Sequence, residues 1–136
     1  MTAGYSGTPL VRKLGIKAGM RCAVLNPPSN YWELLPGLPD DLTIIDDSDA
    51  SADFIHLFVR EREGLSDRLR RLRGSIAPDG MVWVSWPKRA AKIPTDLNED
   101  VIREDALAAG LVDVKVCAVD DVWSGLKLVI RRSDRH

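Results

Sequence analysis

The stretch Met81-Val82-Trp83-Val84-Ser85-Trp86-Pro87-Lys88 decides the fold class of this chain. It follows Pro78-Asp79-Gly80, which favours a turn, and it is rich in the β-branched and aromatic residues that are typical of strands. We expect it to be the central strand of an α/β sheet, with residues 85–88 at its carboxyl end. Ligands of open α/β sheets bind outside the carboxyl ends of the strands, so this stretch also predicts where a ligand would bind.

On both sides of this stretch, apolar runs alternate with amphipathic segments. In the clearest of these segments Leu65, Leu69 and Leu72 recur at helical spacing. Further strands are predicted at residues 20–26, 42–45, 54–59, 111–119 and 126–131. Helices are predicted at residues 8–15, at 65–74, and up to residue 110 from a start at either Thr95 or Asn98.

This alternation predicts a three-layer α/β domain. Right-handed crossovers give a mostly parallel sheet of about six strands with helices on both faces. The short connection over residues 120–125 favours an antiparallel C-terminal hairpin. With an antiparallel last strand, the chain resembles a shortened Rossmann-like methyltransferase sheet, and this resemblance implies the strand order 2-1-3-4-6-5.

Length and composition predict one domain over residues 1–136, with a flexible lead-in at residues 1–7 and a polar tail at residues 132–136. The formal net charge of −1 gives no overall field for nucleic acid or an anionic membrane. No apolar run approaches the roughly 18 residues of a membrane helix. Without a signal peptide, Cys22 and Cys117 are expected to be free thiols, as in a soluble cytoplasmic protein.

The first predicted strand ends in Asn26-Pro27-Pro28-Ser29-Asn30, where a dinucleotide or S-adenosylmethionine site would need glycines. The chain contains no Gly-x-Gly, and two prolines remove two amide donors from the turn. Asp46 follows Asn26 by twenty residues, about the spacing of the acid that binds a cofactor's ribose. A methyltransferase-like enzyme with a divergent cofactor loop, in which Asp46 holds the ribose and His56 serves as base, therefore stays an alternative.

Candidate ligand-binding residues gather around the predicted carboxyl edge of the sheet. They comprise three cations, two aromatic side chains and three hydrogen-bonding side chains: Lys88, Lys92, Lys127, Trp86, Trp123, Asn26, Ser85 and Ser124. Two cysteines and two histidines make a zinc site an unfavoured interpretation, and no residue is assigned a catalytic role.

Two further features each have two interpretations. His56 lies inside a predicted strand, either as a core imidazole with a hydrogen-bond partner or as a general base. The run over residues 60–73 carries six arginines, which form either a solvated helix face or a contact surface for an anion or RNA backbone.

Four short motifs follow one another along the chain: Lys13-Leu14-Gly15-Ile16, the apolar run over residues 54–59, Gly80-x-x-Trp83 leading to Pro87-Lys88, and Trp123-Ser124 before a basic strand. In these motifs the chain resembles the bacterial family called domain of unknown function 3052, from about Thr8 to Arg131. The resemblance implies a small stand-alone bacterial protein, and it supplies no reaction, cofactor or catalytic residue.

Three functions follow from these observations. The first is a non-enzymatic or vestigial Rossmann-like domain that binds a small anionic ligand or a protein partner at the carboxyl edge of the sheet, without a cofactor. The second is the S-adenosylmethionine-dependent methyltransferase-like enzyme. The third is a structural protein that self-associates through an exposed strand edge or the arginine-rich helix. Membrane and nucleic-acid partners are not expected, and the oligomeric state is left open.

Overall fold

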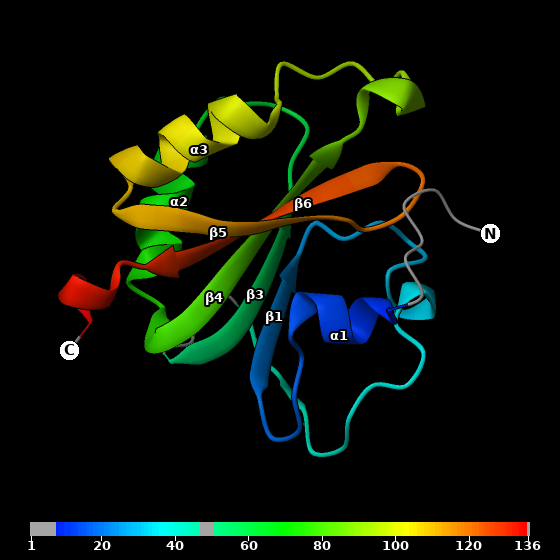
Figure 1. Ribbon diagram of the computed structural model, residues 1–136, viewed down its shortest axis with the longest axis vertical. Coiled ribbons are helices and arrows are strands. Elements are labelled where there is room, and N and C mark those ends of the chain that lie inside the picture. The colour runs from blue at the N-terminus through cyan, green and yellow to red at the C-terminus, as the bar shows by residue number, and fades with distance from the viewer. Residues whose placement is uncertain (1–7, 47–50, 136) are drawn as a thin grey trace.

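A computed structural model describes residues 8–46 and 51–135, in which six strands form one sheet of order β2-β1-β3-β4-β6-β5 (Figure 1). The strands are β1 (Arg21–Leu25), β2 (Thr43–Ile44), β3 (Ala52–Phe58), β4 (Ile76–Pro87), β5 (Leu111–Ala118) and β6 (Trp123–Ile130). The first four pair in parallel, and β6 runs antiparallel between β4 and β5. The predicted strand order and C-terminal hairpin are confirmed.

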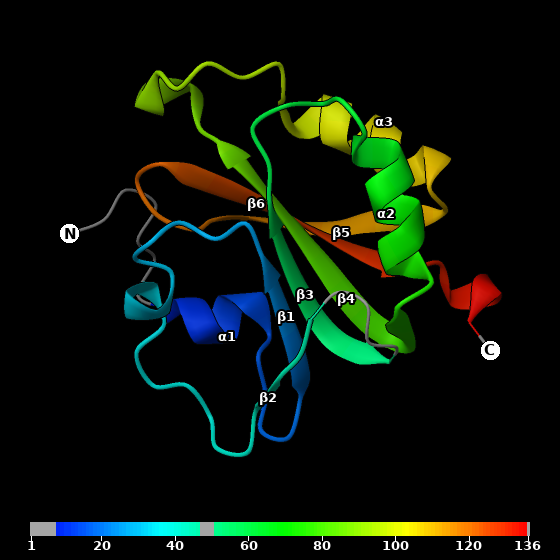
Figure 2. The ribbon, with the colours of Figure 1, turned by 180° about the vertical axis from the view of Figure 1, so that it is seen from behind.

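Helices cover both faces of the sheet, as predicted. On one face lie α2 (Leu65–Arg73) and α3 (Glu99–Ala108), and on the other lie α1 (Leu10–Leu14) and the short 3-10 helix η1 (Trp32–Leu34) (Figures 1 and 2). Each face has its own apolar cluster. Trp86 packs with α2 and α3, whereas Trp83 packs with α1, because side chains of a strand alternate between the faces.

A side-chain hydrogen bond connects the centre of the sheet to α1. The Trp83 indole Nε1–H donates to the carbonyl oxygen of Leu14 at 2.9 Å, and Trp83 is fully buried. α1 ends there because Gly15 takes the left-handed conformation, with φ of 82°. The buried donor is therefore satisfied by a carbonyl that a helix end leaves available.

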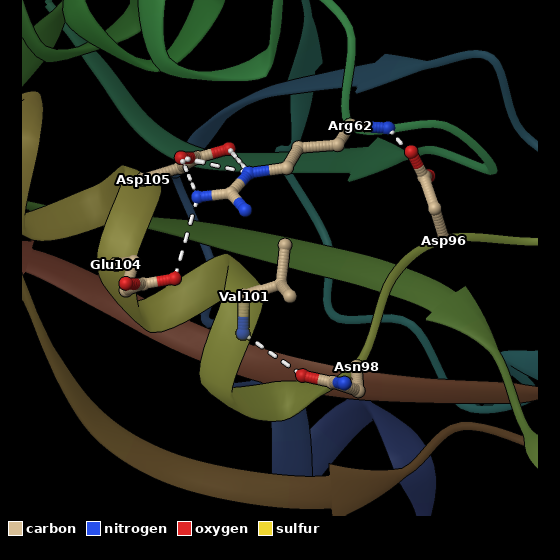
Figure 3. A network of polar contacts seen from close by, with 6 residues as sticks. All are labelled: Arg62, Asp96, Asn98, Val101, Glu104 and Asp105. Carbon is tan, nitrogen blue, oxygen red and sulfur yellow. Dashed lines mark hydrogen bonds and ion pairs between the residues drawn. The ribbon is translucent and has the colours of Figure 1, made fainter.

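A polar network joins the loop before α2 to α3 (Figure 3). The Arg62 guanidinium binds the carboxylates of Asp105 and Glu104 at 3.0 and 3.3 Å, and its backbone N–H donates to Asp96 Oδ1 at 2.8 Å. α3 begins after Asn98, whose Oδ1 accepts the Val101 N–H at 2.9 Å. Of the six arginines in residues 60–73, Arg62 therefore has a structural role, because it pairs with the buried carboxylate of Asp105.

The largest differences from the predicted strand boundaries occur at the starts of β4 and β6. β4 begins at Ile76, so Pro78-Asp79-Gly80 is no turn before the strand but part of a register shift against β3. β6 begins at Trp123 because Ser124 and Gly125 pair with Trp86 and Ser85 of β4.

The remaining predictions concern the chain ends and the thiols. The expected lead-in at residues 1–7 lies outside the described residues, as do residues 47–50 and residue 136 of the tail. η3 (Arg132–Asp134) is a 3-10 turn within that tail. Cys22 and Cys117 are free thiols, as predicted, and burial raises the pKa of Cys22 to about 11. None of the helices in the described ranges is long and apolar enough to cross a membrane.

Candidate functional site

A cavity of about 440 Å³ opens at the carboxyl ends of β1 and β3. Its walls are the turn after β1, the end of β3, the first turn of α2 and the start of β6. β2 lies on one side of β1 and β3 on the other, so the strand order reverses at this point. Because ligands of open α/β sheets bind where the order reverses, this switch-point cavity is the primary candidate site.

Asn26 forms the turn at the wall of the switch-point cavity. Its φ of 54° lies in the left-handed region, which glycine adopts freely and asparagine tolerates better than most residues. The turn continues through Pro27 and Pro28, and the Pro28 carbonyl accepts the Tyr31 N–H at 3.0 Å. Asn26 therefore adopts a backbone conformation that glycine usually takes, although this turn contains no glycine.

This conformation gives a direct prediction for Asn26. Replacement by glycine should leave the free energy of unfolding unchanged within a few tenths of a kcal/mol, whereas Asn26→Ala should lower it by about 1 kcal/mol. Urea denaturation of the three proteins measures the difference. Asn30→Ala is the control, because Asn30 is exposed in the same turn and its φ is not positive. Equal stability of Asn26→Gly and Asn26→Ala would contradict the turn geometry.

Charged and aromatic side chains meet at this cavity. The Arg60 guanidinium carbon lies 5.8 Å from the centroid of the Trp123 ring, which in turn meets Phe58 edge to face at 5.0 Å. Such stacking holds a guanidinium in place while its N–H groups stay available to a ligand. Arg68 is half-buried in the first part of α2, and Glu61 and Glu63 add negative charge to the same walls. Two cations and two carboxylates thus line the cavity: Arg60, Arg68, Glu61 and Glu63.

A buried polar chain runs behind the cavity wall. Tyr31 Oη lies 3.0 Å from His56 Nδ1, and His56 Nε2 lies 2.7 Å from Ser85 Oγ. All three side chains are buried, and the Phe58 ring stacks on the imidazole with centroids 4.3 Å apart. A neutral imidazole has one donor and one acceptor, so either tautomer can satisfy both hydroxyl groups.

Burial determines the charge state of this chain. It lowers the pKa of His56 to about 3, so the imidazole is neutral at physiological pH. Burial also raises the pKa of the Tyr31 hydroxyl well above its usual range. Of the two interpretations of His56, the core imidazole with hydrogen-bond partners is the one that matches this environment.

The predicted ligand residues do not all meet in one place. Asn26 and Trp123 line the switch-point cavity. Trp86, Lys88 and Ser124 line a second hollow of about 610 Å³, between the end of β4 and the loop that leads to α3. A ligand role for these five residues stays a prediction.

The other three predicted ligand residues lie elsewhere. Ser85 is buried with its hydroxyl against His56, and Lys92 is exposed after the 3-10 helix η2 (Arg89–Ala91). Lys127 lies in the middle of β6. Asp46, the ribose-binding candidate, is exposed just beyond β2.

Sequence reasoning missed three residues of this region. Arg60 and Arg68 were treated only as members of the arginine-rich run, although Arg60 directly follows a predicted strand and could have been placed at its carboxyl end. Tyr31 gave no such signal, because its burial depends on packing against Phe58 and His56, which come from β3.

The sheet order and the two helical layers are those of the methyltransferase-like α/β fold. Similar solved structures include a SAM-dependent methyltransferase from Aquifex aeolicus, with a TM-score of 0.58, 12% identity, and coverage of 89% of this chain and 88% of that one. A TehB-like SAM-dependent methyltransferase from Corynebacterium glutamicum has a TM-score of 0.57 and 10% identity, and the match covers 90% of this chain and 85% of that one. At such identities the likeness shows the fold alone.

The sequence itself places the chain in a family. Residues 38–132 match the family described as protein of unknown function (DUF3052), and the chain belongs to that family. The family predicted from the sequence motifs is thereby confirmed, whereas the first motif, Lys13-Leu14-Gly15-Ile16, lies outside the matched residues. No curated protein matches the chain by sequence.

Proposed function

We propose that this protein binds a small anionic ligand in the switch-point cavity. The observation that carries the proposal is the Arg60 guanidinium held over Trp123 at the point where the strand order reverses. A guanidinium donates paired N–H groups to a carboxylate or phosphate, and the charge makes these hydrogen bonds stronger than neutral ones.

The charges around the cavity also restrict the ligand. Arg68 places a second cation near the start of α2, where the helix dipole favours a negative group. Glu61 and Glu63 lie on the same walls, so the ligand that fits best carries hydrogen-bond donors or a cation beside its anionic group. A cavity of about 440 Å³ lies within the size range of small-molecule sites.

The proposal assigns binding and no chemical step. His56 is fully buried behind the stacked Phe58 ring, so its imidazole does not line the cavity where the ligand would lie. Ser85 is buried in the same way. These two side chains support the wall, and the contacts to the ligand come from Arg60, Arg68 and Asn26.

A thermal-shift screen of nucleotides and anionic metabolites tests this proposal. A ligand of the cavity should raise the melting temperature, and Arg60→Gln should weaken its affinity about tenfold or more, the usual cost of losing a hydrogen bond to a charged group. Arg71→Gln is the matched control, because it removes the same charge from an exposed position outside the cavity. The proposal fails if no compound shifts the melting temperature, or if both variants weaken binding equally.

A methyltransferase-like enzyme is the second candidate, because Asp46 lies exposed beyond β2 at the same edge and the fold is that of methyltransferases. In this case S-adenosylmethionine would occupy the switch-point cavity and Asp46 would bind the ribose. Calorimetry with S-adenosylmethionine discriminates the two functions. Absence of heat at millimolar ligand excludes the enzyme, whereas binding that Asp46→Asn weakens would support it.

Self-association through the sheet edge has less support. Val114 and Val116 are exposed on the outer strand β5, at 55% and 47%. However, the register of β5 shifts between Asp113 and Lys115, and Lys115 is exposed between the two valines. Irregular register and edge lysines both hinder edge-to-edge pairing. Light scattering should therefore give the same mass at several protein concentrations, and a mass that rises with concentration would favour self-association.

A further inference from the structure

The hairpin of β5 and β6 places two lysines directly opposite each other. Lys115 of β5 pairs in register with Lys127 of β6, which also pairs with Trp83 of β4. Residues opposite each other on antiparallel strands share a face, so both lysines project on the face that α1 covers. Like charges in this arrangement destabilise a sheet.

A third lysine adds to this repulsion. Lys17 follows α1, and its ammonium group and that of Lys115 both act on the charge of Lys127. Burial first, and then these two cations, lower the pKa of the half-buried Lys127. The lysines come from the α1–β1 turn, β5 and β6, so the fold brings distant segments together to concentrate positive charge.

The protein supplies no ion pair to offset this charge in the part of the chain that the structure describes. None of the carboxylates there lies within salt-bridge distance of Lys17, Lys115 or Lys127. The Lys115 ammonium donates to the carbonyl oxygen of Lys13 at 3.2 Å, which is a neutral acceptor. An anion from solution would stabilise a positive charge that is partly withdrawn from water and repelled by its neighbours.

We propose that Lys17, Lys115 and Lys127, here called the lysine cluster, bind a small multiply charged oxyanion of the phosphate type. An oxyanion between the ammonium groups replaces repulsion between cations by attraction to each of them. Lysine binds phosphate as a point charge, so the cluster needs no planar, bidentate geometry. Three cations whose charges act on one another suit one compact group with two or more charges, rather than an extended polyanion.

The lysine cluster is separate from the switch-point cavity. Lys127 follows Trp123, which lines the cavity, by four residues of β6. At about 3.4 Å per residue this corresponds to about 14 Å along the strand. The two sites can therefore be tested independently, and the cluster does not depend on the function proposed for the cavity.

Pyrophosphate is the probe for the lysine cluster. Isothermal titration of the full chain should detect its binding, and pyrophosphate should raise the melting temperature more than sodium chloride at the same ionic strength. Equal effects of the two salts would mean screening alone and would overturn the proposal.

Substitution of Lys127 links the repulsion to the binding. Lys127→Met removes one cation and keeps the aliphatic packing, so it should raise the melting temperature of the free protein and weaken pyrophosphate binding about tenfold or more. Arg71→Met is the control, since Arg71 is exposed and lies outside both the cluster and the switch-point cavity, and it should change neither quantity beyond a small effect of overall charge. Lys115→Gln should reproduce the loss of affinity, which keeps the test decisive if Lys127→Met folds poorly.

Comparison with the cavity variant completes the design. If Arg60→Gln abolishes pyrophosphate binding and Lys127→Met leaves it intact, the anion binds in the switch-point cavity and the cluster proposal is wrong. If Lys127→Met abolishes it and Arg60→Gln leaves it intact, the cluster binds the anion whether or not the cavity has a ligand of its own.

Discussion

Replacement of Gly80 by alanine is expected to lower the free energy of unfolding by about 1–3 kcal/mol, the usual cost of overpacking. A Cβ at this position would lie 2.8 Å from the carbonyl oxygen of Ala52 and 3.1 Å from that of Ala77. Both are backbone atoms, so neither can rotate away as a flexible side chain would. The added methyl group would instead push β3 and β4 apart where their register shifts.

Urea denaturation at constant pH measures this effect, with Gly74→Ala as the matched control. Gly74 lies at the end of α2 with φ of −72°, and a Cβ there would come no closer than 3.4 Å to another atom outside its immediate neighbours. Its substitution should change stability by less than about 0.5 kcal/mol. If Gly80→Ala were equally mild, the close approach of Gly80 to Ala52 would be wrong.

The second large effect expected is a loss of stability in weak acid caused by His56. Its pKa is about 6.5 in the unfolded chain and about 3 in the folded protein, because burial disfavours the imidazolium. Between these values the unfolded chain binds a proton that the folded protein does not, so stability falls as the pH falls. The contribution is fully present above pH 6.5, and roughly 2 kcal/mol of it should be lost between pH 7 and pH 5.

The His56→Gln variant is the comparison for this prediction, because glutamine stays neutral across the range. The difference in unfolding free energy between wild type and variant should therefore shrink as the pH falls from 7 to 5. Nitrogen NMR of the wild-type imidazole gives an independent reading, since the ring should stay neutral at pH 5. An imidazole that titrates near pH 6 in the folded protein would contradict the buried chain with Tyr31 and Ser85.

The sheet could be predicted from the sequence because its signals are local and repeated. The apolar run over residues 54–59 and the stretch that contains Trp83 and Trp86 both indicate buried strands, and period-two alternation places the two tryptophans on opposite faces. Leu65, Leu69 and Leu72 are all buried on one face of α2, as their spacing predicted. The handedness of the crossovers restricts the possible strand orders without fixing one. The order itself was predicted from the resemblance to the methyltransferase sheet.

The errors at β4 and β6 arise from two glycines that are required by tertiary packing and not by a turn. Gly80 and Gly125 were interpreted as turn residues, yet both lie within strands. A Cβ on Gly125 would lie 3.1 Å from the Trp83 ring, so the glycine is needed because an aromatic side chain of the next strand passes close to it. Composition alone does not distinguish this use of glycine from a turn.

The position of the candidate site was predicted better than the residues that line it. The carboxyl edge of the sheet does hold both hollows, and five of the eight expected residues line one or the other. Lys127 was grouped with this edge because the start of β6 was misplaced. With β6 beginning at Trp123, Lys127 falls in the middle of the strand, beside Lys115.

The position of β1 inside the sheet has a practical consequence for truncation. The matched family region begins at residue 38, but β1 (Arg21–Leu25) is the strand that pairs with both β2 and β3. A fragment that starts at residue 38 would leave β2 without that neighbour, expose one edge of β3 and remove the Leu14 carbonyl that receives the Trp83 indole. Such a fragment should misfold or aggregate on expression, and a peptide over residues 8–26 is the segment that could restore it by strand complementation.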